Sequence, residues 1–318
     1  MGNEQSSEET QPVQIIKPVD QETVETIEQK QHQQIHIEQD TKVEDFFKYR
    51  NSNTIDDALK CMDMLGTCVN KIEPSAVEPY VKDGIKIKVL FVIVNTYEKP
   101  NYKLGVGPLN DSITVALNHV KMGYRMVYLH NSTTTHFLKW LKFILKKTQS
   151  DLTIFYTGHG SYVRDRSGDE SDGYDEVMLF DNGYIIDDEL ANYLCRYAHG
   201  QRIVLLSDCC HSGSMWDIQS MIQGKSCNIK PNIISISAAK DSQTAKQTKI
   251  KSKDQGIFTF YFWQIWEQKA KISAKDMERK INPSISRFSQ HFTFASTTEN
   301  LPNEPIFPHD IEAKYVAN

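Results

Sequence analysis

Beyond about position 85, short apolar runs alternate with segments whose apolar residues recur every three or four positions. The runs predict buried strands, and the longer spacing predicts amphipathic helices. A hairpin is predicted where Glu176–Phe180 and Tyr184–Ile186 flank Asp-Asn-Gly. This alternation predicts an α/β fold with a mostly parallel sheet and helices on both faces. The other predicted strands are Ile87–Val94, Arg125–Leu129, Leu152–Tyr156, Ile203–Ser207, Ile233–Ser237 and Phe292–Ala295, and the predicted helices are Asp111–Lys121, Thr134–Lys147, Asp188–Tyr197, Ile257–Glu267 and Ala274–Ile281.

The pattern also divides the chain. Residues 1–42 are rich in Gln, Glu and Thr and poor in aromatic residues, so we expect a disordered tail. Residues 43–84 begin with helical spacing up to about Val69, and we expect a helical segment that packs on the main body. Residues 85–318 form the predicted main domain.

Composition narrows the function class. A net charge of −5 does not resemble a nucleic-acid footprint and fits a basic substrate. The six cysteines match no secreted disulfide framework, and no apolar stretch is long enough to span a membrane, so we expect a reducing, cytoplasmic setting. Met1-Gly2-Asn-Glu-Gln-Ser6 matches a myristoylation pattern, which would make the protein peripheral to membranes, or it is a chance match on a tail.

Two predicted strands end in residues that carry chemistry. Leu152–Tyr156 leads into Thr-Gly-His159-Gly160, and Ile203–Ser207 leads into Asp208-Cys-Cys210-His-Ser-Gly213. The carboxyl ends of parallel strands meet at the edge where sites form in open α/β sheets. We expect Cys210 to be a nucleophile, His159 its base, and the N–H groups of Gly160 and Cys210 an oxyanion hole. A cysteine after an apolar run can also be a buried small hydrophobe, but the two segments together favour catalysis.

At these residues the chain resembles the metacaspases, which are caspase-like cysteine peptidases. Further resemblance lies in Asp172-Gly-Tyr-Asp175-Glu176, Ile186-Asp187-Asp188 and Ile236-Ser-Ala-Ala-Lys-Asp241-Ser-Gln-Thr, and it extends from about Ile87 to about Ser296. The resemblance implies a caspase-like three-layer sandwich with a His159–Cys210 dyad. It also implies cleavage after Arg or Lys of a protein substrate by an enzyme that we expect to be a monomer.

Substrate selection follows from charge. The resemblance places Asp111 and Asp208 in a pocket for the basic side chain before the scissile bond, and we also expect Thr157 to contact substrate. Two carboxylates facing one pocket would select a guanidinium. Asp111 can equally be the N-cap of the helix that follows it.

An acidic segment between Asp165 and Asp188 suggests a metal. A family-type calcium site would use Asp175, Asp187, Asp188 and the distant Asp217, and calcium prefers such oxygen ligands. The alternative is a solvated acidic loop. The loop between Phe180 and Tyr184 is shorter than is usual in the family, which can change how Asp187 and Asp188 are presented.

Taken together, we expect a calcium-activated cysteine endopeptidase made as a zymogen. Two lysine-containing linkers, Gly224–Pro231 and Lys246–Lys253, are candidate autocatalytic cleavage sites or simply exposed basic loops. The rival hypothesis is a non-catalytic scaffold of the same fold that binds a basic partner.

Overall fold

The apolar runs lie at the centre of a parallel sheet. The computed structural model describes residues 40–165, 168, 173–209, 215–218, 232–238, 247–250 and 252–312. The chain divides into two compact units, Met1–Glu44 and Asp45–Asn318. Residues 1–39 of the predicted tail, including Gly2, lie outside the described residues, as does the linker Gly224–Pro231, and the last three residues predicted as tail, 40–42, begin a helix. The second unit holds the sheet, the predicted site and most of the segment predicted to be helical.

The described residues contain a seven-stranded sheet in the order β1-β3-β2-β4-β8-β9-β12. Neighbouring strands are parallel throughout, except that β12 runs antiparallel to β9. The central strands β2, β4 and β8 are buried at every position, as a strand covered on both faces must be. The strands are β1 (Gly66–Cys68), β2 (Val89–Val94), β3 (Arg125–His130), β4 (Leu152–Thr157), β8 (Ile203–Asp208), β9 (Ile233–Ser237) and β12 (Thr293–Ser296).

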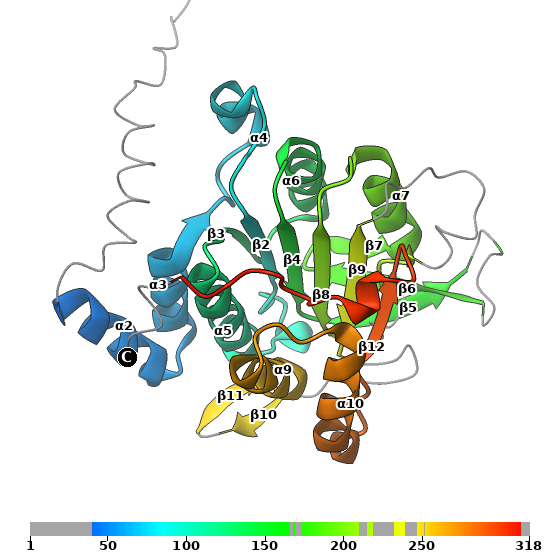
Figure 1. Ribbon diagram of the computed structural model, residues 1–318. Coiled ribbons are helices and arrows are strands. Elements are labelled where there is room, and N and C mark those ends of the chain that lie inside the picture. The colour runs from blue at the N-terminus through cyan, green and yellow to red at the C-terminus, as the bar shows by residue number, and fades with distance from the viewer. Residues whose placement is uncertain are drawn as a thin grey trace, which may run out of the picture. The chain divides into compact units, whose positions relative to one another are not determined.

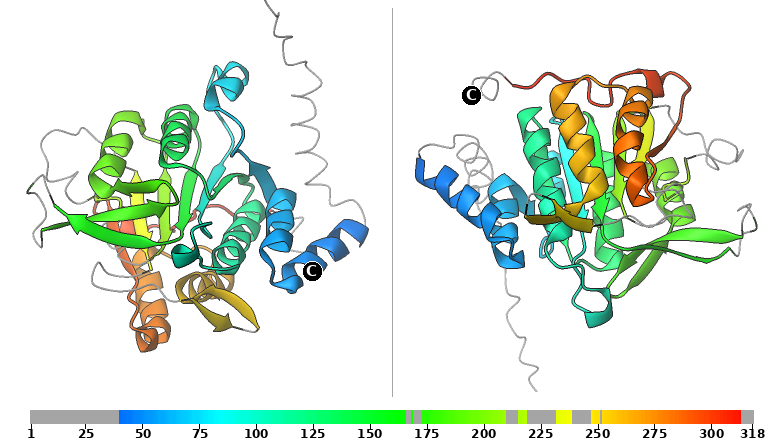
Figure 2. Two further views of the ribbon diagram at one scale, coloured as in Figure 1. Left: turned by 180° about the vertical axis from the view of Figure 1, so that it is seen from behind. Right: turned by 90° about the horizontal axis from the view of Figure 1, so that it is seen from below.

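Helices cover both faces of this sheet (Figure 1, Figure 2). One core joins α3, α5, α9 and α10 to Val92, Phe155 and Leu206. The other joins α6 and α7 to Phe91 and Ile154. The prediction of an α/β fold with a mostly parallel sheet between two helical layers is therefore confirmed. The helices are α2 (Asp40–Ser52), α3 (Ile55–Leu65), α4 (Pro74–Val77), α5 (Gly107–Lys121), α6 (Thr134–Lys147), α7 (Asp187–Tyr197), α9 (Ile257–Gln268) and α10 (Ala274–Ile285), with 3-10 turns at Glu78–Val81, Pro100–Tyr102, Ser286–Phe288 and Leu301–Asn303.

Two smaller sheets lie beside the main one. The first contains β5 (Gly160–Arg164), β6 (Tyr174–Phe180) and β7 (Gly183–Ile186), and its β6–β7 hairpin matches the one predicted around Asp-Asn-Gly. The second pairs β10 (Gln247–Ile250) with β11 (Lys253–Gly256). β5 begins directly after His159. The sheet of β5, β6 and β7 and the main sheet therefore meet at the predicted site.

The structure corrects three sequence-based expectations. Residues Gly66–Cys68 are not helical but form β1, which pairs with β3 at the sheet edge. Lys246–Lys253 is not a loop over its described part, because Gln247–Ile250 and Lys253–Gly256 pair as a hairpin. The helix predicted from Asp111 begins one turn earlier, at Gly107, with Pro108 in its first turn. Asp111 is therefore inside the helix, and the N-cap interpretation is wrong.

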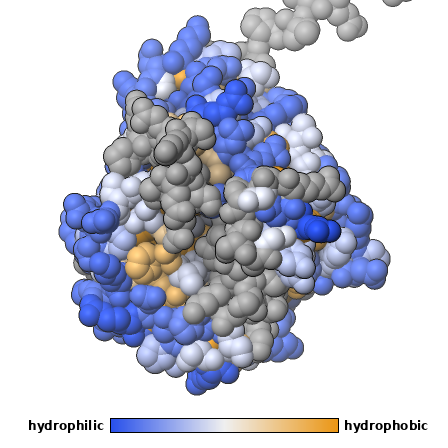
Figure 3. All heavy atoms as spheres, turned by 90° about the vertical axis from the view of Figure 1, so that its right-hand side faces the viewer, coloured by the Kyte–Doolittle hydropathy of each residue, from blue (hydrophilic) through white to orange (hydrophobic). Residues whose placement is uncertain are grey.

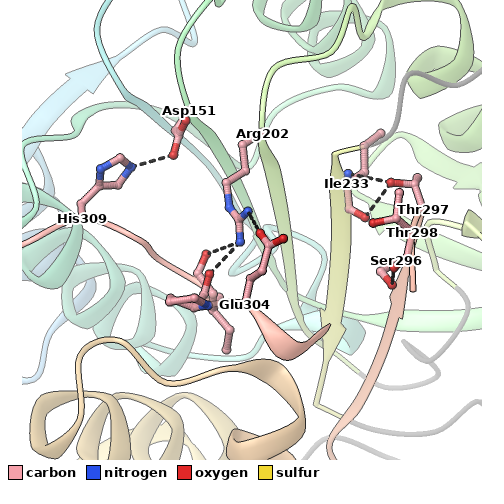
Figure 4. A network of polar contacts seen from close by, with 10 residues as sticks. Asp151, Arg202, Ile233, Ser296, Thr297, Thr298, Glu304 and His309 are labelled. Atoms are coloured by element: carbon pink, nitrogen blue, oxygen red, sulfur yellow. Dashed lines mark hydrogen bonds and ion pairs between the residues drawn. The ribbon is translucent and has the colours of Figure 1, made fainter. Parts of the chain in front are cut away.

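The segment Glu304–Glu312 crosses the sheet at the amino-terminal ends of its strands; we call it the C-terminal strap (Figure 4). The Arg202 guanidinium donates to the carbonyl oxygen of Pro305 at 2.7 Å and forms an ion pair with Glu304 at 3.2 Å. The His309 ring lies 2.6 Å from the Asp151 carboxylate, and Glu312 N–H donates to Lys121 O at 2.8 Å. The strap therefore fastens the end of the described chain to the edge opposite the predicted site.

Among the described residues, large apolar side chains are exposed at a few scattered positions, such as Phe47, Ile87 and Tyr184. Figure 3 shows a face on which hydrophilic residues predominate among the coloured atoms, with one compact hydrophobic patch. No helix in the described part of the chain is long and apolar enough to cross a membrane. Cys61 and Cys68 are free thiols, whereas Cys195 is disulfide-bonded, which the cysteine spacing did not predict.

Candidate active site

His159 lies just beyond β4, at the carboxyl end of the sheet. Its Nε2 is 2.8 Å from the carbonyl oxygen of Tyr102. A carbonyl oxygen only accepts hydrogen bonds, so Nε2 carries the proton in this contact and Nδ1 is the basic nitrogen of the neutral ring. The Tyr97 ring packs on the imidazole with centroids 4.9 Å apart, and the Tyr102 ring meets it edge-on at 6.0 Å. The imidazole is thus oriented from two sides.

Cys210 lies outside the described residues. The strand that leads to it is described: β8 runs parallel to β4, with Thr157 opposite Asp208. His159 and Cys210 each lie two residues beyond this pair in the chain. Cys209, next in sequence to Asp208, is buried in the core on the opposite face, as expected for a structural thiol.

The structure brings Asp111 and Asp208 together around Gly256. Gly256 N–H donates to both carboxylate oxygens of Asp111, at 2.8 and 2.9 Å. The Thr259 backbone N–H and hydroxyl donate to Asp208 Oδ2, at 3.2 and 2.5 Å. A Cβ at Gly256 would lie 2.3 Å from Asp208 Oδ2 and 2.9 Å from Asp111 Oδ2, so only glycine fits here. The amino-terminal turn of α9 therefore packs against both carboxylates, an arrangement that the sequence did not reveal.

Burial dominates the electrostatics of this pair. The Asp111 and Asp208 side chains belong to residues that are 1% and 6% exposed. Burial raises the pKa of Asp208 to about 6. Burial, and then the neighbouring Asp208 carboxylate, raise the pKa of Asp111 well above its ordinary value. Without a cation nearby, ionisation of the second of two buried carboxylates is unfavourable. A cationic side chain placed between them would stabilise the ionised form of both.

The third predicted substrate residue, Thr157, is fully buried at the end of β4. Its position opposite Asp208 puts it beside the acidic pair on the same face of the sheet. The Thr157 hydroxyl has no hydrogen-bond partner within the described parts of the chain. A buried hydroxyl without a partner costs free energy, and a polar group of a ligand would offset that cost. Gly160, predicted for the oxyanion hole, begins β5 and is half-buried.

Three of the residues predicted to bind calcium lie elsewhere: Asp175 is in β6, and Asp187 and Asp188 begin α7, whereas Asp217 belongs to the described segment 215–218. Asp175, Asp187 and Asp217 are buried, at 5%, 1% and 7% exposure. Both Asp187 oxygens accept backbone N–H groups, from Glu176 at 3.1 Å and from Asp188 at 2.9 Å. Burial raises the pKa of Asp187 to about 8. Buried carboxylates are chemically suited to calcium. In the described part of the chain, however, no three His, Cys, Asp or Glu side chains are arranged to hold a metal ion.

Comparisons with known proteins identify the same region. Residues 106–219 match the family model "Metacaspase, peptidase C14 domain". Metacaspase-1B of Aspergillus fumigatus is 29% identical over 165 residues, which cover 46% of this chain and 40% of that protein. Metacaspase-1 of Eremothecium gossypii is 35% identical over 108 residues, which cover 32% of this chain and 24% of that protein.

Among solved structures, the Geobacter sulfurreducens protein GSU0716 aligns with 70% of this chain and 100% of its own, at 22% identity and a TM-score of 0.54, and so shares the fold. The alignments to the two metacaspases span less than half the length of either relative. The matched segment contains His159, both pocket carboxylates and the Cys210 motif. Residues 106–219 of this chain are therefore similar to the peptidase domain of the metacaspases.

Proposed function

We propose that this protein is a cysteine endopeptidase that cleaves after Arg or Lys, with Cys210 as nucleophile and His159 as general base. The observation that carries the proposal is the register of two neighbouring strands. β4 and β8 end side by side, the first leading to an oriented imidazole and the second to a buried carboxylate and then to Cys210. The family match over the same residues supports the reaction class.

In the proposed reaction, His159 Nδ1 takes the thiol proton and the Cys210 sulfur attacks the scissile carbonyl carbon. Backbone N–H groups of Gly160 and Cys210 stabilise the oxyanion. His159 then protonates the leaving amine, which leaves a thioester on Cys210. Water, deprotonated by His159, attacks the thioester, and the returning proton restores the thiol. The carbonyl of Tyr102 supports this sequence because it keeps the proton on Nε2 and presents Nδ1 for each transfer.

Specificity for a basic residue is proposed from the acidic pair. A guanidinium or ammonium group near Asp111 and Asp208 would neutralise two carboxylates that burial makes costly to ionise. A substrate with Asp or Glu at the same position would add a third negative charge to the pocket. We therefore expect rejection of acidic residues there.

A panel of peptides that differ only before the scissile bond (Arg, Lys, Asn, Asp and Ala) tests both claims. Wild type should cleave the Arg and Lys peptides, and Cys210→Ala and His159→Ala should not. Cys61→Ala, which removes a free buried thiol elsewhere, is the matched control and should retain turnover. Undiminished turnover by Cys210→Ala would overturn the assignment. A folded wild type that cleaves none of the peptides would favour the scaffold hypothesis.

We propose further that calcium binds the acidic region around β6 and raises activity. Its support is chemical: three buried carboxylates, Asp175, Asp187 and Asp217, supply the hard oxygen donors that this ion prefers. The proposal requires these side chains to converge when the ion binds. Titration of calcium alone into Cys210→Ala should give heat that Asp187→Asn abolishes. Equal heats for both proteins, or a peptidase rate indifferent to chelator, would remove the calcium claim.

Self-processing is proposed at the β10–β11 hairpin. Lys249 is exposed there, and it stands opposite Asp254 in the paired strands. A peptidase binds its substrate as an unpaired extended segment, so cleavage requires the hairpin to open first. Mass spectrometry of wild type incubated alone should find a cut between residues 249 and 253. The Cys210→Ala protein should stay intact, and a cut in that variant would show that another protease made it.

A further inference from the structure

We infer that Tyr97 and Tyr156 are positioning residues that hold the backbone of His159 with their hydroxyl groups. The inference rests on the proposed function, in which His159 is the general base. Tyr97 follows β2 and Tyr156 lies within β4, so the two hydroxyls reach His159 from neighbouring strands. Both tyrosines are buried, at 3% and 0% exposure, although each carries a polar group.

The hydrogen bonds around His159 assign a role to each hydroxyl. His159 N–H donates to the Tyr97 hydroxyl oxygen at 2.6 Å. The Tyr97 hydroxyl donates to Leu179 O at 3.1 Å. The Tyr156 hydroxyl donates to His159 O at 2.7 Å, and Leu179 N–H donates to the same oxygen at 3.1 Å. The Tyr156 hydroxyl also lies 3.1 Å from Leu179 O and 3.5 Å from the Tyr97 hydroxyl, but its contact with His159 O is the shortest. With the Tyr156 proton on His159 O and the Tyr97 proton on Leu179 O, the four bonds are mutually compatible. They tie His159 to β2, β4 and β6 together.

The backbone at Tyr97 is strained in the conformation that places its hydroxyl. Tyr97 has φ of 63°, in the left-handed region that a bulky residue rarely adopts. Such a conformation persists only where surrounding contacts hold it, and these positions cluster at functional sites. The neighbouring Gly158 fits the same arrangement, because a Cβ there would lie 2.8 Å from the Tyr97 hydroxyl and 3.1 Å from that of Tyr156. Gly158 leaves the space that the two hydroxyls need.

Tyr97 also contacts the imidazole itself. Its ring lies 4.9 Å from the His159 ring at an interplanar angle of 33°, so one side chain orients both the backbone and the ring. The two tyrosines are not equivalent. Tyr97 is the partner of the His159 N–H, whereas His159 O retains the Leu179 N–H when the Tyr156 hydroxyl is removed. Loss of the Tyr97 hydroxyl should therefore affect the reaction more.

Phenylalanine variants test the inference because they remove one oxygen and keep the ring. Tyr97→Phe should lower kcat roughly tenfold to a hundredfold with KM changed by less than about twofold, as expected for a misplaced base. Tyr156→Phe should lower kcat by about threefold. Amide hydrogen exchange at His159 should become faster in Tyr97→Phe. Tyr128→Phe is the matched control: Tyr128 is a buried tyrosine of the neighbouring strand β3 whose hydroxyl donates to Asp63 at 2.5 Å.

The outcomes separate this inference from the proposed function. Equal kcat losses in Tyr97→Phe and Tyr128→Phe, or unchanged kcat and His159 exchange in Tyr97→Phe, would overturn it while the peptidase assignment stands. If wild type has no peptidase activity, the proposed function fails, and faster His159 exchange in Tyr97→Phe still supports the hydroxyl contacts. Should Tyr97→Phe not fold, a larger kcat loss in Tyr156→Phe than in Tyr128→Phe supports the inference, and an equal loss contradicts it.

Discussion

Replacement of Asp208 by Asn should stabilise the protein while it abolishes cleavage after Arg and Lys. The folded state raises the pKa of Asp208 from 3.8 to about 6 through burial, so folding favours its protonated form. Protonation of Asp208 therefore adds to the free energy of unfolding, and this contribution is complete below pH 3.8 and is lost as the pH rises through about 6. At neutral pH the ionised carboxylate therefore costs about 3 kcal/mol relative to a neutral one, at 1.36 kcal/mol per pKa unit.

The amide in Asp208→Asn cannot ionise, its oxygen can still accept the Thr259 hydrogen bonds, and its NH₂ group can donate toward Asp111. Urea unfolding followed from about pH 4 to about pH 8 should show the stability of Asp208→Asn rising relative to wild type as the pH increases, because the two proteins share the titrations of Asp111, Asp187 and His119 and differ in that of residue 208. The exposed Asp83 provides the control Asp83→Asn, which should match wild type at every pH. A destabilised Asp208→Asn, or parallel pH profiles for it and wild type, would refute the reasoning.

Three other predictions concern separate parts of the fold. Gly158→Ala should lower kcat and the free energy of unfolding, by about 1–3 kcal/mol for the latter, because its methyl group would overlap the Tyr97 hydroxyl; unchanged values of both would contradict this. His119 is buried, its Nε2 has no partner in the described structure, and burial lowers its pKa to about 3. As the pH falls from about 7 to about 5, wild type should therefore lose about 2 kcal/mol of its free energy of unfolding that His119→Phe does not lose, measured in the same denaturation assay. Arg202→Ala should lower stability by about 1–3 kcal/mol through the C-terminal strap with kcat unchanged, and a fall in kcat at full stability would show that the strap influences the site.

The fold could be predicted from the sequence wherever a strand is completely buried. β2, β4 and β8 are covered on both faces, so their apolar runs were unmistakable. β1 has only three residues and is a strand because it pairs with β3, which no local sequence pattern predicts. The β10–β11 hairpin is polar and lysine-rich, so its strands carry little apolar signal. Pro108 in the first turn of α5 was an available signal for the earlier start of that helix.

Only part of the site could be predicted from the sequence, because a motif identifies its own residues but not the distant residues that contact them. Asp111 and Asp208 were assigned to one pocket, and the structure places both beside Gly256. The contribution of Gly256 could not be foreseen, since it is 145 residues from Asp111 in the chain. Tyr97 went unnoticed because its role depends on a positive φ and on contacts from β4 and β6, none of which leaves a pattern in the sequence.

The route of the last described residues determines what a single cut in the β10–β11 hairpin would do. The chain after that hairpin supplies α9, α10 and β12, and β12 pairs with β9 from the preceding part. The strap then returns beneath the sheet to Arg202, Asp151 and Lys121. A nicked molecule would therefore remain one non-covalent particle, migrating as two bands under denaturing conditions but eluting as one species on gel filtration. Cleavage at this place would change the chain's connectivity without dividing the protein.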